Sequence, residues 1–471
     1  MNPTFFMLLL AASFVQEALH GDTEWSADRV ARRALEVDPG IGAARLDAEA
    51  AAFHTEEAEA SILPRVELSA RFTRLTTIDN DPLVSLPGGT AEAVALASQV
   101  DDPEAQALWL TQLAVLEQSV IEIPENQGAF RASIAYPVTA LFFEILPGIQ
   151  ARKGVEAARV LETEVARRAA ELTAVEIYFL HARSRAADAV AKVAVAEARQ
   201  NLERAEARFR EGAGAEPEVL RFRARLAEVR GVRAERRAQV EASAEALRAL
   251  LDLEGRGRIG IAEPVDQAPA RRFSEPIGTL IERAQEQRAE VRAVTRLAEA
   301  RRTAAGAAGG AAVPRLSVSA EIQSARPNPS FVPPGDGFRT NGAASVVLQW
   351  SPDGAWAASR RARRTRREAA RIEAQRSALL DQIRIEVSRF ASTYRASFER
   401  FEASTAQRKA AESAYAARLE SYGLGLSEGS ELLEASLDLD RARLAVIDAG
   451  VQIRVREAQL MRALGESRVE R

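Results

Sequence analysis

The sequence predicts a mainly α-helical chain with a small β component, in which one helical hairpin unit is duplicated. Three observations support this fold class. Hydrophobic residues make up 47% of the 471 residues and aromatic residues only 6%, so alanine, leucine and valine carry most of the apolar content, and alanine has the highest helix propensity. Two stretches of roughly 60 residues contain no proline, the residue that breaks helices. The two halves of the chain also align with one another.

The composition excludes several classes of function. With 63 basic and 67 acidic residues, the net charge of −4 predicts neither a disordered acidic tail nor an overall attraction to nucleic acid. The absence of cysteine excludes a disulfide scaffold, a thiolate metal site and a cysteine nucleophile. The three histidines, His20, His54 and His181, are scattered, and no phosphate-binding loop or serine nucleophile motif occurs. We therefore expect no enzyme, no catalytic residues, no cofactor and no bound metal.

The N-terminal segment resembles a secretory signal. Phe5–Val15 is the only concentrated apolar run, and its length fits a signal peptide but falls short of the about 20 residues that span a bilayer. No basic residue precedes it, so a buried N-terminal helix is the alternative. We expect a signal peptide at residues 1–21. Downstream, no uncharged apolar stretch of about 20 residues predicts a transmembrane helix.

An internal duplication organises the rest of the chain. Ala34–Ala70 aligns without gaps with Ala284–Ala320, and the prolines of two Pro-Arg pairs give an offset of 314 − 64 = 250 residues. Arg208–Leu220 aligns with Ser421–Leu433, and two glycines give an offset of 425 − 212 = 213. The difference, 250 − 213 = 37, means that the first half carries about 37 extra residues. They belong to an insert at 75–128.

The domain boundaries follow from this alignment. We expect a first repeat at 22–254, a linker at 255–275 and a second repeat at 276–471. Each repeat contains two predicted strands and one long helical hairpin. The strands are expected near 62–74, 129–138, 313–324 and 342–350.

The predicted strands alternate apolar and polar residues. In the first of them, Val66, Leu68 and Phe72 alternate with Glu67 and Arg71. The wall of a membrane β-barrel needs this pattern, because one face meets lipid and the other meets water. A soluble sheet that packs on one side only is the alternative.

Very long helices account for most of the remaining residues. Proline-free stretches at 148–210 and 355–421 are followed by returning helices at 217–253 and 428–464. Such stretches extend roughly 90 Å as helix, which is too long for an ordinary globular element. Small and aliphatic residues at coiled-coil spacing would let the helices tile into the wall of a tunnel. An antiparallel coiled-coil rod without a pore is the alternative.

The hairpin tip near 421–433 carries the most specific motif. Its sequence, Tyr-Gly-Leu-Gly-Leu-Ser-Glu-Gly-Ser-Glu-Leu-Leu, resembles the tip turn of the TolC-like outer membrane efflux protein family, and the tip near 209–220 is a looser copy. The order of elements is similar as well. The resemblance implies a homotrimer in the outer membrane, in which four strands per subunit contribute to a 12-stranded barrel. The duplicated hairpins would form an α-helical tunnel that extends into the periplasm.

The same resemblance implies a function. The chain would be the outer membrane channel of a tripartite export system, a passive exit duct for small molecules such as drugs, toxic compounds or metals. Its partners would be a periplasmic adaptor, an inner-membrane RND or ABC pump and outer membrane lipid, with no nucleic acid. Two alternatives stay open: the outer membrane component of a type I protein secretion system, and a coiled-coil scaffold protein without a pore.

Candidate site residues lie at the tips and on the long helices. The expected adaptor-docking residues are Gly212, Glu218, Val219, Gly425, Leu426, Ser427, Glu431 and Leu432. The last four of these would form a partly apolar docking surface. Glu412 and Glu420 could line a pore constriction, although surface solvation is the favoured role for both. The arginine run at 360–371 could bind nucleic acid or, facing a pore, favour anions. A solvated helix face is favoured, because no aromatic residues interrupt the run.

Overall fold

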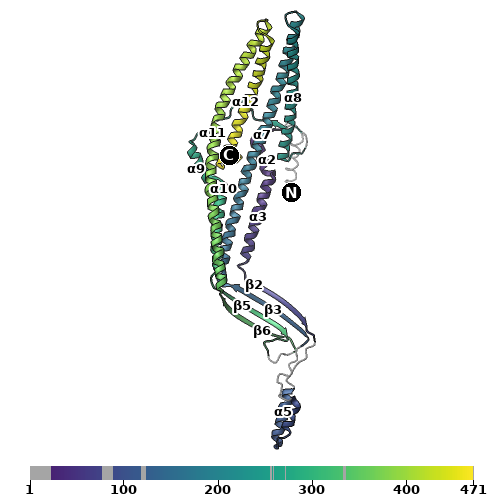
Figure 1. The fold of residues 1–471 in the computed structure, drawn as a ribbon, viewed down its shortest axis with the longest axis vertical. Coiled ribbons are helices and arrows are strands. Elements are labelled where there is room, and N and C mark those ends of the chain that lie inside the picture. The colour runs from purple at the N-terminus through teal and green to yellow at the C-terminus, as the bar shows by residue number, and fades with distance from the viewer. Residues whose placement is uncertain are drawn as a thin grey trace, which may run out of the picture. The chain divides into compact units, whose positions relative to one another are not determined.

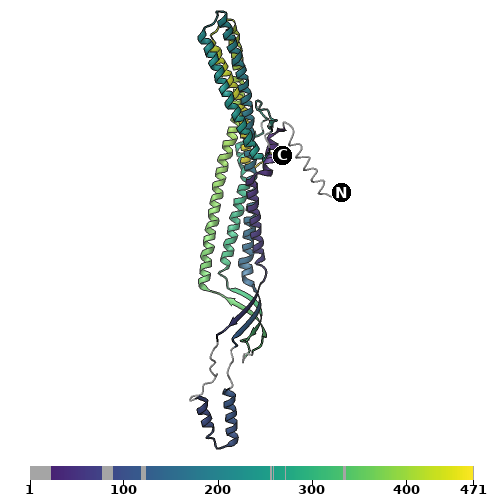
Figure 2. The same ribbon diagram turned by 90° about the vertical axis from the view of Figure 1, so that its right-hand side faces the viewer.

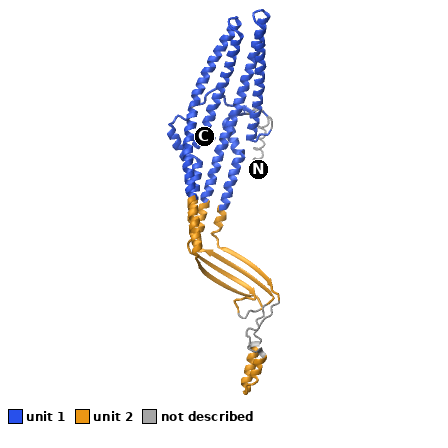
Figure 3. Ribbon diagram, in the orientation of Figure 1, with its two compact units in different colours: residues 1–54, 153–300, 368–471 blue, residues 55–152, 301–367 orange. Residues whose placement is uncertain are grey.

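The structure is a computed structural model that describes residues 23–76, 89–117, 124–254, 257, 259–270, 272–331 and 336–469. The predicted signal peptide at 1–21 lies outside these residues, as do parts of the insert and of the linker. The chain divides into two compact units, which Figure 3 shows in different colours. Unit 1 comprises 1–54, 153–300 and 368–471, and unit 2 comprises 55–152 and 301–367.

Unit 2 is built on one antiparallel sheet. Its strands occur in the order β2 (Arg65–Arg74), β3 (Asn126–Pro137), β5 (Arg315–Arg326) and β6 (Arg339–Gln349). Each strand stands within a few residues of a predicted one. Among the described residues, β2 and β6 each pair with a strand on one side only, so each has an edge that no described strand covers.

The register of the sheet separates apolar from polar side chains. Val66 lies opposite Ile134, which lies opposite Ala320, and these residues belong to one face. On the other face, Arg131 donates a hydrogen bond to Gln323 over 3.1 Å. The apolar face is uncovered: Leu68 is 78% exposed, and most of its apolar neighbours are exposed as well. The sheet thus has two exposed faces of opposite character.

The insert between the first two strands contains two short helices. They are α4 (Gly89–Ala97) and α5 (Pro103–Glu117), which pack against each other. Together they form a helical hairpin within the insert (Figure 2).

The helices show the duplication directly. Helices α2 (Ala27–Val37) and α3 (Pro39–Ala60) have the same lengths as α9 (Ile277–Gln287) and α10 (Ala289–Gly310), at the expected offset of 250 residues. The long helices are α7 (Leu146–Arg210) and α11 (Pro352–Gly423). The returning helices, α8 (Glu216–Leu251) and α12 (Gly429–Leu464), are both 36 residues long and lie at the offset of 213. Four further short elements occur among the described residues: β1 (Thr23–Trp25), which is parallel to β4 (Ile259–Ile261), α6 (Val138–Ala140), and the π-helical turn η1 (Leu141–Ile145).

Four helices lie side by side in the order α3, α7, α10 and α11 (Figures 1 and 2). Three close contacts fix this order: Thr163 of α7 bonds to the carbonyl of Ala44 in α3 over 3.1 Å, Gly154 of α7 faces Ala300 of α10, and Gly309 of α10 faces Ala362 of α11. A Cβ atom on Gly154 would come within 2.8 Å of the Ala300 Cβ, so small residues set the spacing of α7 and α10. None of the described helices has an apolar stretch long enough to cross a bilayer.

Alanine fills the seams of the long helices. Along α7, the buried residues recur every three or four positions: Ala187, Ala191, Ala194 and Ala198. This spacing keeps one face of the helix against its neighbours over several turns. Alanine at such positions permits close packing of helices, as the sequence predicts.

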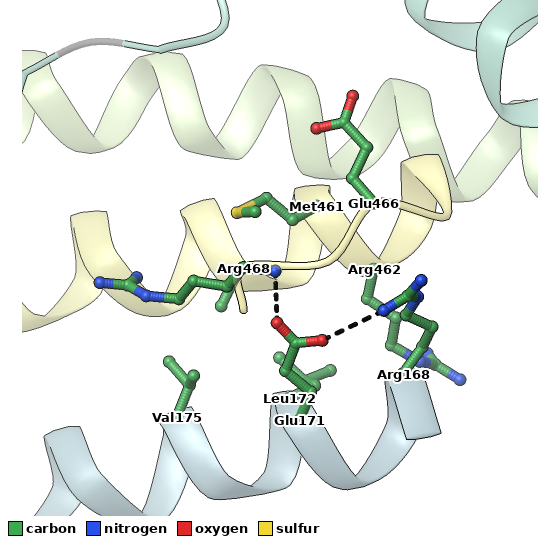
Figure 4. Close-up of a pocket in the computed structure, with 9 residues that line it drawn as sticks. Arg168, Glu171, Leu172, Val175, Met461, Arg462, Glu466 and Arg468 are labelled. Atoms are coloured by element: carbon green, nitrogen blue, oxygen red, sulfur yellow. Dashed lines mark hydrogen bonds and ion pairs between the residues drawn. The ribbon is translucent and has the colours of Figure 1, made fainter. Parts of the chain in front are cut away.

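The C-terminal end of the chain is fixed by one buried carboxylate. Glu171 of α7 accepts hydrogen bonds from the Ser467 hydroxyl over 3.0 Å and from the backbone N–H of Arg468. The same carboxylate forms an ion pair with Arg168, 3.6 Å away on α7. Figure 4 shows this carboxylate at the side of a small hollow between α7 and α12. A buried charge needs such partners, so Ser467 and Arg468 are held against α7.

The linker between the repeats packs on α12. The guanidinium of Arg454 donates hydrogen bonds to the carbonyls of Pro264, over 2.6 Å, and Gln267, over 3.0 Å. Next to it, Gly450 lies so close to the linker that a Cβ atom would stand 1.9 Å from the carbonyl oxygen of Val265. The linker can occupy this place only because residue 450 has no side chain.

We predict that Gly450→Ala destabilises the protein by about 1–3 kcal/mol, because the backbone of the linker must move to admit the methyl group. Gly231→Ala is the matched control, since nothing lies within 4 Å of a Cβ atom at that position of α8; it should be neutral or stabilise by up to about 1 kcal/mol. Thermal unfolding of the purified variants measures both effects. Equal midpoints for the two variants would contradict the packing described.

Candidate functional site: the paired hairpin tips

The two long hairpins end in turns of the same geometry. Gly212 and Gly425 both have φ of +76°, a conformation that glycine adopts without the steric cost of a side chain. In each turn the glycine N–H donates to a carbonyl three residues earlier over 3.1 Å, and the next N–H closes the turn over 2.9 Å. This pair of bonds satisfies the last carbonyls of α7 and α11. The sequence predicts glycine turns at both positions, and the structure contains them.

The two tips pack on each other through five buried residues, which we call the tip cluster: Ala205, Val219, Phe222, Tyr422 and Leu432. The rings of Phe222 and Tyr422 lie 5.7 Å apart and join the first hairpin to the second. Leu432 is fully buried and Val219 nearly so. In this chain both residues therefore fill the space between the hairpins and are not part of an exposed docking surface, contrary to the expectation for Leu432.

Polar contacts surround the tip cluster. The guanidinium of Arg208 lies 4.5 Å from the centre of the Tyr422 ring and donates a hydrogen bond to the Tyr422 carbonyl. The carboxylate of Glu218 stands over Gly429, where a Cβ atom would come within 2.2 Å of it. Burial and the nearby Glu218 raise the pKa of Tyr422 to about 12, so its hydroxyl stays protonated at neutral pH. Two side chains of the first hairpin, Arg208 and Glu218, thus contact Tyr422 and Gly429 of the second hairpin.

Two ion pairs join the helices next to the tip cluster. Arg225 of α8 pairs with Asp440 of α12 at 2.8 Å, and Arg443 of α12 pairs with Glu197 of α7 at 2.9 Å. Burial raises the pKa of Asp440 to about 6, although Arg225 opposes the shift. Asp440 therefore titrates in a range that most aspartates do not reach.

The remaining predicted residues lie at the apex or on the outer helix faces. Leu426 is 78% exposed, and Ser427 is half-buried. Glu431 forms an ion pair with Arg418 of its own hairpin. The apolar residues that project from the second turn are thus Leu426 and its neighbour Leu424, which is 69% exposed.

The two carboxylates expected at a constriction are both exposed. Glu412 forms an ion pair with Arg408, 3.8 Å away and one turn earlier on α11. Glu420 lies two turns further along the same helix. The structure describes a single copy, so a role of either residue in a pore stays a prediction.

Several residues of this site are not apparent from the sequence. Phe222 follows Val219 by one helical turn, and this spacing could have assigned it to the tip cluster. Arg208 and Asp440 have no such signal, because each is one charged residue among many on a long helix. Within the described residues, no three His, Asp or Glu side chains gather as a metal site would require.

Asp440 gives the tips a predictable response to pH. Because its pKa in the packed tips is above its ordinary value of 3.8, the packed state binds the proton more tightly than a separated state in which the carboxyl is hydrated. Packing of the hairpins should therefore strengthen as the pH falls from about 7 through 6, and weaken as it rises. Asp440→Asn should remove most of this response.

Amide hydrogen exchange at the start of α12, corrected for the intrinsic effect of pH, measures this packing. Asp438→Asn is the matched control, because Asp438 is an exposed carboxylate on the same helix that pairs only with Arg441, 3.2 Å away, among the described contacts. It should leave the response intact. The same pH dependence in wild type and Asp440→Asn would assign the effect to another group.

Comparisons with known proteins agree with this architecture. Residues 280–466 match the family model described as outer membrane efflux protein. No curated protein matches the sequence. Among solved structures, the chain is similar to CusC, with 14% identity and a TM-score of 0.72 over 96% of this chain and 96% of that chain.

Two further solved structures are outer membrane proteins. VceC from Vibrio cholerae has 18% identity and a TM-score of 0.70, covering 94% of this chain and 96% of that chain. The CmeC outer membrane channel from Campylobacter jejuni has 17% identity and a TM-score of 0.70, covering 93% and 85%. The predicted resemblance is confirmed: the second repeat carries the sequence signature of the outer membrane efflux proteins, and the described chain has the fold of the solved outer membrane channels.

Proposed function

We propose that the chain is the outer membrane channel of a tripartite export system and serves as a passive exit duct for small molecules. The family signature and the channel fold support an efflux duct. Within this chain, the observation that carries the proposal is the sheet of unit 2, which has one apolar and one polar face, both exposed. Soluble monomers rarely expose so large an apolar surface, whereas lipid would cover it in a membrane.

The open edges of the sheet indicate how the duct is completed. Strands β2 and β6 each have one row of backbone N–H and C=O groups that pairs with no strand in the described part of the chain. Such groups are costly in a bilayer, where no water can replace the missing partner. In our proposal three copies pair β6 with β2 of the next copy and close a 12-stranded barrel.

Aromatic residues support a membrane boundary at the base of the sheet. Phe142 and Phe143 of η1, Trp350 after β6 and Trp356 of α11 are all exposed. Their backbone positions follow the ends of β3 and β6 by a few residues. Aromatic girdles occupy the interfaces of membrane barrels, so these side chains would lie at the periplasmic surface of the outer membrane.

The long hairpins would form the periplasmic tunnel. Its narrow end would be at the tips, where Leu424 and Leu426 offer an exposed apolar surface on either side of Gly425. We propose that a helical hairpin of a periplasmic adaptor binds there and separates the hairpins. The energy for export would come from an RND or ABC pump of the inner membrane, because the sequence has no nucleotide-binding motif.

Fractionation and conductance test the proposed function. The protein should occur in outer membrane fractions as a heat-modifiable trimer and should open single channels in planar bilayers. Recovery of a soluble protein that does not conduct would contradict the proposal and favour a coiled-coil scaffold.

Introducing negative charge at the apex of the second turn tests the proposed docking surface. Leu424→Asp with Leu426→Asp should abolish crosslinking to the adaptor and reduce export, because carboxylates cannot be buried in an apolar contact without a partner. The trimer should persist, since both side chains project from the turn. Val232→Asp, at an exposed position of α8 away from the apex, is the matched control and should export normally. Unchanged crosslinking of the double variant would rule out docking at the apex.

A further inference from the structure

The polar face of the sheet carries more arginine than carboxylate. Every registered pair joins two odd-numbered or two even-numbered residues, so the odd-numbered residues of β2, β3, β5 and β6 share this face. The charged residues among them are five arginines and two glutamates, a balance of 5 − 2 = +3: Arg65, Glu67, Arg71, Arg131, Arg315, Glu321 and Arg339. In the proposed duct this face lines the lumen, because the apolar face meets lipid.

Three of these arginines have a carboxylate nearby. The Nε atom of Arg131 lies 3.9 Å from a carboxylate oxygen of Glu321, and Arg315 forms an ion pair with the carboxylate of η1 at 3.1 Å. Arg65 has Glu67 two positions further along the same strand and on the same face. The excess of positive charge on this face therefore comes from the other two arginines.

Arg71 and Arg339, which we call the exit arginines, form no ion pair with the described part of the chain. They belong to one row across the sheet: Arg71 lies opposite Ala129, Ala129 opposite Ala325, and Ala325 opposite Arg339. Both arginines are exposed. Because the two residues between them are short alanines, this row combines two positive charges with no carboxylate and no bulky side chain.

The row lies near the end of the sheet that is opposite to the long helices. Strand β2 ends three residues after Arg71, and β6 begins at Arg339. The helices α7 and α11 follow the other ends of β3 and β6. With the helices in the periplasm, as proposed, the exit arginines stand at the outer end of the duct, where solutes leave it.

The loop between β5 and β6 folds onto the polar face beside Arg339. The side-chain amide of Asn328, which is almost completely buried, donates hydrogen bonds to the Arg339 carbonyl over 2.8 Å and to Oδ1 of Asn341 over 2.7 Å. Asn341 in turn donates to Oγ of Ser330 over 3.1 Å. The guanidinium of Arg339 lies 5.2 Å from the centre of the Phe331 ring. Since Asn341 is odd-numbered, the loop occupies the side of the sheet that would face the lumen.

The residue before Arg339 supports this assignment of the two sides. Phe338 packs on the apolar face, where its ring lies 5.9 Å from the ring of Phe130 and covers Gly128. Neighbouring residues of an extended chain point to opposite sides. The side chain of Arg339 therefore belongs to the polar side, together with the loop.

We propose that the exit arginines and the β5–β6 loop form an anion filter at the outer end of the duct, so that the channel favours anionic solutes. This inference rests on the proposed function and names the class of solute. Three copies would place 3 × 2 = 6 guanidinium groups around the lumen, and rings of arginine give pores a preference for anions. Because a guanidinium binds carboxylate, phosphate and sulfonate groups through paired hydrogen bonds, organic anions with these groups fit the filter.

Ion selectivity of the reconstituted trimer tests the filter. In planar bilayers under a KCl gradient near 0.1 M, the wild type should pass Cl⁻ roughly three to ten times more readily than K⁺, since charges act over about 10 Å at this salt concentration. Arg71→Gln with Arg339→Gln should bring the permeability ratio to about 1, and Arg71→Glu with Arg339→Glu should reverse the preference. Arg71→Lys with Arg339→Lys should retain it, because the charge is kept.

Arg74→Gln is the matched control for Arg71→Gln. Both substitutions remove one positive charge near the same end of β2, but residue 74 is even-numbered and belongs to the apolar face. The control should keep the wild-type ratio, whereas Arg71→Gln alone should lower it. Equal ratios for these two variants would overturn the inference.

Two other charged segments are alternative sources of selectivity. The arginine run of α11 is exposed, and Arg363→Gln with Arg367→Gln tests its contribution. A preference for anions that only this variant removes would place the filter on α11 and overturn the inference. The insert at 75–128 contains nine carboxylates and no basic residue, so a wild-type channel that prefers K⁺ would show that the insert governs the current and would also overturn it.

The role of the loop has its own readout. Asn328→Ala removes the amide that holds the loop on the polar face, so the single-channel conductance should rise while the preference for Cl⁻ falls. Unchanged conductance and selectivity in this variant would contradict a filter that includes the loop. Persistence of the heat-modifiable trimer shows that each variant is folded.

Organic ions extend the test to larger solutes. Gluconate and N-methylglucamine are similar in size and opposite in charge, so a gradient of their salt gives the permeability ratio of the two ions directly. The wild type should favour gluconate, and Arg71→Gln with Arg339→Gln should lose this preference. A conducting trimer without selectivity would overturn the inference and leave the proposed channel intact. A soluble protein that does not conduct would contradict the proposed function itself.

Discussion

The row of four strands and the row of four helices each have a first and a last member with no described neighbour on its outer side. The rest of the architecture depends on that constraint. The four strands of unit 2 run in the same order as the four helices connected to them, and each row leaves its first and last member with a neighbour on one side. An edge strand presents unpaired backbone groups, and helices in proteins, including the 65-residue α7 and the 72-residue α11, owe most of their stability to the packing of their apolar faces. Copies of the same chain can satisfy both requirements at once.

The contacts within the chain differ in kind along its length. Small residues such as Gly154 and Ala300 hold α7 and α10 at close range, and such packing cannot loosen without opening cavities. At the tips, by contrast, the contact between hairpins relies on a few rings and on ion pairs such as Arg225 with Asp440. When the hairpins separate, water hydrates both charges of such a buried pair, and this hydration offsets much of the lost attraction. The tips are thus the part of unit 1 that is best suited to separate, where a duct would have to open.

Much of the fold could be predicted from the sequence, because its signals are local. Alternation in Val66–Phe72 predicts a strand, and the two tip glycines predict tight turns. Leu432 shows the limit of such reasoning. Its motif places it beside Leu426, yet the first is buried and the second exposed, since the packing of one hairpin on the other decides which face is covered. Asp440 was missed for the same reason: its partner Arg225 lies 215 residues away.

The central claim is that this chain is one third of a closed ring, and electron cryomicroscopy of the full-length protein in lipid nanodiscs tests it most directly. The account predicts threefold particles in which β6 of each copy is hydrogen-bonded to β2 of the next and the apolar face of the sheet meets the lipid. Particles that contain a single copy, with the edges of β2 and β6 uncovered, would contradict it.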